Sequence, residues 1–175
     1  MKKIIIILFL FISTVSAYSQ FTYGPRLGFG ATTIENANAG FGMHAGVFIN
    51  AEIFDRIGLQ PEILFNFQTG SEEMDDGLGG TLDVDYQHQT IDVPILIFFP
   101  LSDHLRVLVG PMISSISSAK REVDGDEDDT YDPSVESGFA VGLETDTFSR
   151  LRFGARYRKA TTSSIEITAS YTLDW

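Results

Sequence analysis

The stretch FGMHAGVFINAEI, residues 41–53, alternates apolar side chains with small or polar ones. Successive side chains of a β-strand point to opposite faces, so a strand over these residues has one apolar face and one polar face. Only Phe48 breaks the polar face. The apolar face carries Phe41, Met43, Ala45, Val47, Ile49, Ala51 and Ile53.

Seven further segments alternate with the same period, and helical periodicity is absent downstream of the N-terminus. An even number of strands joined by consecutive antiparallel connections favours a closed up-and-down barrel. We therefore predict an all-β fold, an eight-stranded antiparallel up-and-down barrel. The other seven predicted strands cover residues 21–32, 57–68, 86–99, 105–118, 137–145, 151–158 and 165–175.

The polar faces of these strands are rich in glycine and carry charges of both signs that nearly balance. The interior of an eight-stranded barrel is just wide enough for side chains, and enclosed charges need partners. The polar faces are therefore predicted to point inward and the apolar faces to contact lipid, as in a transmembrane β-barrel. We expect a network of charges in the lumen formed by Arg26, Glu52, Glu62, Asp92, Arg106, Glu144, Arg152, Arg156, Arg158 and Glu166.

The links between the predicted strands alternate in length. Short links at 54–56, 100–104 and 146–150 alternate with longer ones at about 33–39, 69–85 and 119–136. Short periplasmic turns and longer extracellular loops are the arrangement of outer-membrane barrels. Four prolines fall inside predicted strands, where each removes a ladder donor, so we expect bulges or local breaks at Pro25, Pro61, Pro94 and Pro111.

The N-terminus has the composition of an export signal. Lys2 and Lys3 precede an apolar run from Ile4 to Ile12, and small residues follow. This run is too short for a membrane-spanning helix, which needs about 20 apolar residues. We predict a cleavable signal peptide over residues 1–17, with cleavage after Ala17 or Ser19, and a barrel domain over 18–175 in the outer membrane.

The composition excludes several classes of function. The chain has 12 Lys and Arg against 24 Asp and Glu, a formal net charge of −12, which excludes nucleic acid as a partner. It has no Cys, so disulfides, thiolate metal sites and a cysteine nucleophile are excluded. The expected partners are outer-membrane lipid, lipopolysaccharide and the barrel assembly machinery. We expect a monomer without a cofactor.

The acidity is concentrated in two predicted loops. Residues 69–85 carry six acids, and residues 119–136 carry eight acids with Lys120 and Arg121, so each segment has a net charge of −6. The simplest interpretation is a solvated anionic surface screened by divalent cations. A low-affinity Ca²⁺ site is the alternative, because hard cations prefer several carboxylates; its ligands would be Asp124, Asp126, Asp128 and Asp129.

Three alternative functions stay open at this point. A serine among Ser114, Ser115, Ser117 and Ser118 with His44 or His88 would make a membrane-embedded lipid-modifying enzyme, although no motif fixes a nucleophile beside a base; His104 lies in a predicted turn. A secreted soluble barrel would bury the apolar faces and bind an apolar ligand. A conducting porin is disfavoured, because eight strands enclose a filled lumen.

The C-terminus resembles the signal that barrel assembly machinery recognises on a last strand, with Tyr171, Leu173 and Trp175 on one face. The phrases GLQPEIL at 58–64, IDVPIL at 91–96 and VGP at 109–111 resemble the PorT-like outer-membrane β-barrel proteins of Bacteroidetes-type bacteria. Members of that family are small barrels, mostly of unassigned role, and the founding one is linked to protein secretion. The resemblance implies a non-enzymatic protein with a structural or interaction role at the cell surface, or an accessory of secretion.

Overall fold

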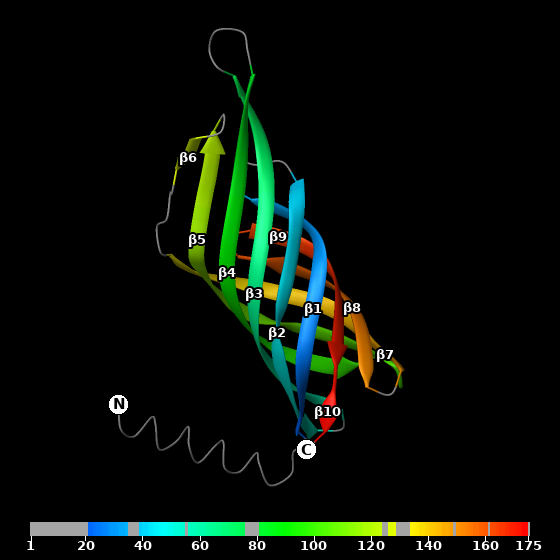
Figure 1. Ribbon diagram of the computed structural model, residues 1–175. Coiled ribbons are helices and arrows are strands. Elements are labelled where there is room, and N and C mark those ends of the chain that lie inside the picture. Colours follow the sequence, from blue (N-terminus) through cyan, green and yellow to red (C-terminus); the bar gives the residue numbers. More distant parts are fainter. Residues whose placement is uncertain are drawn as a thin grey trace, which may run out of the picture.

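The structure is a computed structural model that describes residues 21–34, 39–54, 56–75, 81–123, 126–128, 134–148, 150–160 and 162–174. All regular elements of these residues are strands (Figure 1). They are β1 (Phe21–Ile34), β2 (Ala39–Phe54), β3 (Ile57–Asp75), β4 (Thr81–Pro100), β5 (Leu105–Val123), β6 (Asp126–Asp128), β7 (Val135–Phe148), β8 (Leu151–Lys159), β9 (Thr162–Tyr171) and β10 (Leu173–Asp174).

The strands close into one antiparallel barrel. Each main strand pairs with the next along the chain, and β1 pairs with β9 from Arg26↔Ser170 to Ile34↔Thr162. The short β10 extends the path of β9 and pairs with the start of β1. The barrel wall therefore consists of eight main strands, because β6 pairs only with the end of β5 and β10 continues β9. The predicted eight-stranded antiparallel barrel is confirmed.

Three neighbouring strands are much longer than the sequence pattern indicated. The β3–β4 ladder continues to Asp75↔Thr81, and the β4–β5 ladder continues to Val84↔Val123. The prediction of loops over 69–85 and 119–136 was therefore wrong for most of the first segment and for the start of the second. In Figure 1 these strands rise beyond the rest of the barrel as one sheet, which we call the β3–β5 extension (residues 70–75, 81–86 and 119–123).

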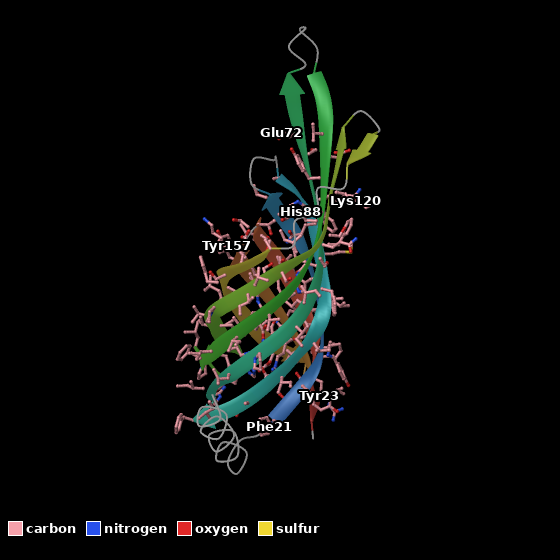
Figure 2. The ribbon with its side chains drawn as sticks, turned by 90° about the vertical axis from the view of Figure 1, so that its left-hand side faces the viewer. Phe21, Tyr23, Glu72, His88, Lys120 and Tyr157 are labelled. Carbon is pink, nitrogen blue, oxygen red and sulfur yellow. The ribbon has the colours of Figure 1, made fainter. Side chains whose placement is uncertain are left out.

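The opposite end of the barrel is closed by short turns. Arg56 lies in the turn between β2 and β3 with φ of 72°, the left-handed region. Its guanidinium donates to the Asp103 carboxylate at 3.0 Å and to the backbone oxygens of Ser102 and Asp103, which belong to the β4–β5 turn. This contact joins two turns at the short-turn end, where Figure 2 also shows Phe21 and Tyr23.

The four prolines do not shift the strand register. Pro25 pairs with Val47 within a continuous ladder, and Pro111 pairs with Phe139 in the same way. The register shifts lie elsewhere, at 52–54, 89–90 and 146–148. No bulge lies at a proline, so that part of the expectation was wrong, whereas the expected local breaks do occur. The β2–β3, β3–β4 and β4–β5 ladders each skip two pairings beside Pro61, Pro94 and Pro111 without a change of register. A proline removes one N–H donor from a ladder, and the bonds of the flanking residues hold the register.

The side chains are arranged inside out relative to a soluble protein. Val47 is 54% exposed and Ile95 is 48% exposed, whereas Glu62 is 2% and Arg156 is 3% exposed. The apolar faces therefore form the outer wall and the polar faces line the lumen. This arrangement rules out the soluble barrel, which would bury the apolar faces. In the part of the chain that the structure describes, no helix is long and apolar enough to cross a bilayer.

Candidate functional site

The lumen of the barrel holds the densest set of interacting polar groups in the described structure. Alternate residues of β1, β3, β4, β5, β7, β8 and β9 point inward, and each contributes charged side chains to the axis. These charges form two groups, which we call the lower cluster (Arg26, Glu62, Arg106, Glu144, Arg156) and the upper cluster (His44, Asp92, Arg158, Glu166).

The lower cluster sets three arginines against two glutamates. Arg156 donates from both terminal nitrogens to the two oxygens of Glu62, at 2.7 and 3.0 Å. Glu144 accepts from Arg106 at 2.5 Å and lies 2.6 Å from the guanidinium of Arg26. Bidentate, charge-assisted bonds of this kind are among the strongest polar contacts in proteins. They cross-link β1, β3, β5, β7 and β8 through the lumen.

The upper cluster sets one arginine against two carboxylates. Arg158 donates through Nε to both oxygens of Glu166 at 3.0 Å, and through Nη1 to Asp92 at 2.5 Å. Nη2 of Arg158 donates to Glu166 and to the Asn66 side chain. The imidazole Nδ1 of His44 lies 3.2 Å from Glu166. Arg158 therefore binds both carboxylates of this cluster, whereas His44 contacts only Glu166 among the described ion pairs.

Apolar side chains fill much of the remaining lumen, and this was missed from the sequence. Leu96, Phe98, Leu108 and Ala140 form a fully buried cluster. The Phe98 ring lies 4.9 Å from the Arg106 guanidinium, and the Phe48 ring lies 5.2 Å from that of Arg26, both in cation–π geometry. The signal was present as breaks in the polar alternation, since Phe48, Leu96 and Phe98 occupy inward positions. The lumen is thus a packed core with ionic layers.

Two glycines of the wall make room for bulky lumenal rings. A Cβ at Gly28 would lie 2.2 Å from the ring of His44, and its three closest neighbours are all atoms of that ring. A Cβ at Gly58 would lie 2.6 Å from the Phe98 ring and 2.1 Å from a backbone oxygen of Ala51. The inward glycines therefore relieve crowding in a narrow interior, as the sequence predicts.

Gly28→Ala should lower the free energy of unfolding by about 1–3 kcal/mol, because the new methyl group overlaps the His44 ring. The loss should disappear when His44→Ala removes that ring, so the double variant should be no less stable than His44→Ala alone. Gly42→Ala is the matched control, because its nearest neighbours would lie at 3.5 Å. Denaturant unfolding in detergent micelles measures wild type and the four variants. Equal losses at Gly28 and Gly42 would contradict the steric argument.

A protein-family model identifies the chain. The model described as outer membrane protein beta-barrel domain matches residues 4–173, almost the whole sequence. The chain belongs to this outer-membrane β-barrel family. Its location is therefore the bacterial outer membrane, and the exposed apolar wall is the surface that contacts lipid. No curated protein matches the sequence.

Solved structures of outer-membrane proteins are similar to this chain. The structure of Neisserial surface protein A is 13% identical, with a TM-score of 0.53, and the match covers 89% of this chain and 97% of that one. Ail, the attachment invasion locus protein of Yersinia pestis, in complex with the heparin analogue sucrose octasulfate, is 12% identical with a TM-score of 0.44 over 88% of this chain and 99% of that one. At these identities the first likeness shows the fold alone.

The ten charged residues predicted to lie in the lumen occupy three environments: the two ionic clusters, an ion pair near the short-turn end, and a polar cleft at that end. The two clusters contain eight of the ten predicted residues. Arg152 instead donates to Asp146 at 2.6 Å near the short-turn end, outside both clusters. Glu52 is half-buried and lines a polar cleft of about 50 Å³ at the same end, together with Arg56, Arg106 and Arg152. His44 joins the upper cluster although the sequence offered it only as a possible catalytic base.

The other predicted site residues are only partly described in this outer-membrane barrel. Tyr171 ends β9 and is exposed, Leu173 lies in β10, and Trp175 is outside the described residues. Asp126 and Asp128 belong to β6, but their side chains are outside the description, as are Asp124 and Asp129 entirely. The Ca²⁺ site therefore stays a prediction.

Among the described hydrogen bonds, none joins a serine hydroxyl to a histidine imidazole. Ser114 donates to Asp92 at 2.6 Å, inside the lumen, and Ser117 donates to the backbone oxygen of Gln89. His44 contacts Glu166 instead, and the backbone N–H of His104 donates to the Ser102 hydroxyl at 3.3 Å. The lipid-modifying enzyme considered from the sequence thus has no nucleophile and base in contact in the described part of the chain.

Proposed function

We propose that this outer-membrane barrel is a non-enzymatic membrane anchor that holds an acidic sheet at the cell surface, where the sheet binds a partner with a cationic face. The observation that supports this proposal is the β3–β5 extension, because its ladders continue past Gln68↔His88 to Asp75↔Thr81. Short turns belong to the periplasmic end and long connections to the extracellular end of such barrels. The extension therefore lies on the extracellular side.

The charge of the extension selects the chemistry of the partner. The extension carries six acids against Lys120 and Arg121, a net charge of −4, and the longer segments 69–85 and 119–136 that contain it together carry −12. Figure 2 shows Glu72 high on the extension, and its carboxylate accepts from the Tyr86 hydroxyl at 3.2 Å. A predominantly negative field of this kind steers a positively charged partner and raises its rate of association. Divalent cations would bridge the same acids to anionic polysaccharide.

The resemblance to PorT-like barrels supports a role as an accessory of secretion. The three phrases that carry the resemblance lie on the neighbouring strands β3, β4 and β5. The register pairs the first two directly, as in Pro61↔Ile95, and the third lies beside the second, because Val109 pairs with Ile97, the residue that follows IDVPIL. They therefore form one continuous part of the wall below the extension. We propose that the chain is a PorT-like member and that its partner belongs to the export route for secreted proteins.

Site-specific cross-linking tests the proposed surface contact. The chain has no Cys, so Ser71→Cys in the extension gives a single thiol for a cross-linker on intact cells. We expect one discrete adduct from this position, and loss of the adduct when Glu72, Glu73 and Asp85 are changed to Gln, Gln and Asn. Ser102→Cys, in a periplasmic turn, is the control. An adduct of the same mass from both positions, or one that survives neutralisation, would refute the proposal.

The packed lumen leads to a second prediction, that the barrel does not conduct ions. Purified barrel added to a planar lipid bilayer should produce no discrete conductance steps, because the buried side chains of Leu96, Phe98 and Leu108 fill the lumen together with the two ionic clusters. A sixteen-stranded porin incorporated under the same conditions provides the positive control. Reproducible steps from the folded wild-type barrel would show that the lumen opens, and would favour a channel over an anchor.

A further inference from the structure

We propose that an acyl chain of lipopolysaccharide binds in a trough on the outer wall of the barrel, across β3, β2, β1, β9 and β8. The inference uses only the location of the protein in the outer membrane and is independent of the surface partner. The trough has a volume of about 900 Å³. Its outward-facing lining includes Leu27, Phe29, Met43, Ala45, Phe65 and Ala169, and the inward-facing residues His44, Asn66 and Thr168 also contribute to the lining.

The strand register explains why the wall is hollow at this place. Leu27 of β1 pairs with Ala45 of β2 on one side and with Ala169 of β9 on the other. Ala45 pairs in turn with Phe65, and Ala169 pairs with Phe153. A row of outward residues therefore reads Phe, Ala, Leu, Ala, Phe across five strands. The small side chains of the two alanines leave space on both sides of Leu27. The two phenylalanine rings bound this space at its ends.

The dimensions of this row fit a hydrocarbon chain. Four steps between neighbouring strands, each about 4.8 Å, give a row of about 19 Å. One leaflet of a bilayer contributes about half of a hydrocarbon core that is roughly 30 Å thick. Because strands of such barrels are tilted, a row across them runs obliquely through the membrane. An extended acyl chain that enters from one leaflet therefore has room along the whole trough.

The polar end of the trough indicates the leaflet and the head group. Gln89 lines the trough on β4, and the next outward residue of that strand, Gln87, pairs with exposed Lys120 of β5. Figure 2 shows Lys120 toward the extracellular end of the barrel. Lipopolysaccharide is the anionic lipid of the extracellular leaflet, so its phosphates would lie at the level of this lysine while an acyl chain extends down past Phe65.

Native mass spectrometry of barrel extracted in mild detergent tests the proposal. Ala45→Phe with Ala169→Phe fills the trough from two outward positions. Ala51→Phe is the matched control, since it lies on the same strand and face as Ala45 but outside the trough. Heat-modifiable gel mobility establishes that each variant is folded. We expect one lipopolysaccharide molecule retained by wild type and by Ala51→Phe, and at least tenfold lower occupancy in the filled variant.

A second arm uses protein refolded without lipid and then titrated with purified lipopolysaccharide. We expect saturable binding that Lys120→Gln weakens severalfold and that phospholipid vesicles do not reproduce. Equal retention by the filled variant and the control would overturn the proposal. So would phospholipid in place of lipopolysaccharide, or a second copy of the chain occupying this face.

Discussion

Arg158→Met should destabilise the folded barrel by about 3–5 kcal/mol, the cost of removing one partner from a buried ionic group. Arg158 is the single arginine of the upper cluster and donates to Glu166, Asp92 and Asn66. Its removal leaves two buried carboxylates with His44 as the remaining basic neighbour. Methionine retains most of the side-chain volume, so the loss of charge dominates the effect. Urea unfolding of barrel reconstituted in vesicles measures the change.

Two further variants separate electrostatics from packing. Adding Asp92→Asn and Glu166→Gln to Arg158→Met removes the uncompensated charges and should restore most of the lost stability. Arg152→Met should cost about 1 kcal/mol or less, because Arg152 pairs with Asp146 at the periplasmic end, where the Asp146 side chain is 46% exposed. If Arg158→Met and Arg152→Met have the same effect, the upper cluster does not stabilise the barrel.

Val47→Arg should destabilise the barrel in a bilayer by about 2–4 kcal/mol, because it places a charge on the lipid-facing wall near the middle of the membrane. Val47 is 54% exposed and lies midway between Phe41 and Phe54 at the two ends of β2. It pairs with Pro25 and Ile63, which face outward from the neighbouring strands. The measurement is again denaturant unfolding in vesicles.

The same substitution at the rim provides the comparison. Val135 is the first residue of β7, is 72% exposed and lies at the extracellular end of its strand. Val135→Arg should cost about 0–1 kcal/mol, since the cost of a charge on the lipid face falls toward the interface. Similar losses at both positions, or no loss at Val47, would show that the apolar wall does not face lipid.

The alternation of the sequence predicted the barrel because period two is a local property of each strand. Every second residue from Phe41 to Ile53 is apolar, and Val47 and Ile95 are indeed on the outer wall. The β3–β5 extension gave little such signal, because residues 72–80 mix acids with glycine and show no alternation. Residues 81–85 do alternate, but their acids have the parity of the outward apolar residues of β4, so the pattern of a lipid-facing strand does not include them. Hydrogen-bonded ladders to the neighbouring strands hold these residues in strands. A sequence pattern of apolar and polar residues does not reveal such pairing.

The contents of the lumen were predictable in kind but not in pairing. Charges on the inward face had to find partners, and the sequence named most of them. Which carboxylate meets which arginine depends on the register around the closed barrel: Glu62 and Arg156 are 94 positions apart. Leu64, Leu108 and Met112 were missed as lumenal residues because each is a single apolar break in an otherwise polar or small face, and the assignment of that face did not use the breaks.

This long-range pairing sets the order in which the molecule can be assembled. Glu62 lies on the third main strand and contacts Arg156 of β8, the seventh of the eight, only when the sheet has curled round far enough to close. An unfinished sheet would carry those ions to the bilayer without counterparts, at a cost of several kcal/mol each. Insertion and seam closure should therefore occur as one concerted event, and a chain interrupted before Arg156 should stay outside the hydrocarbon.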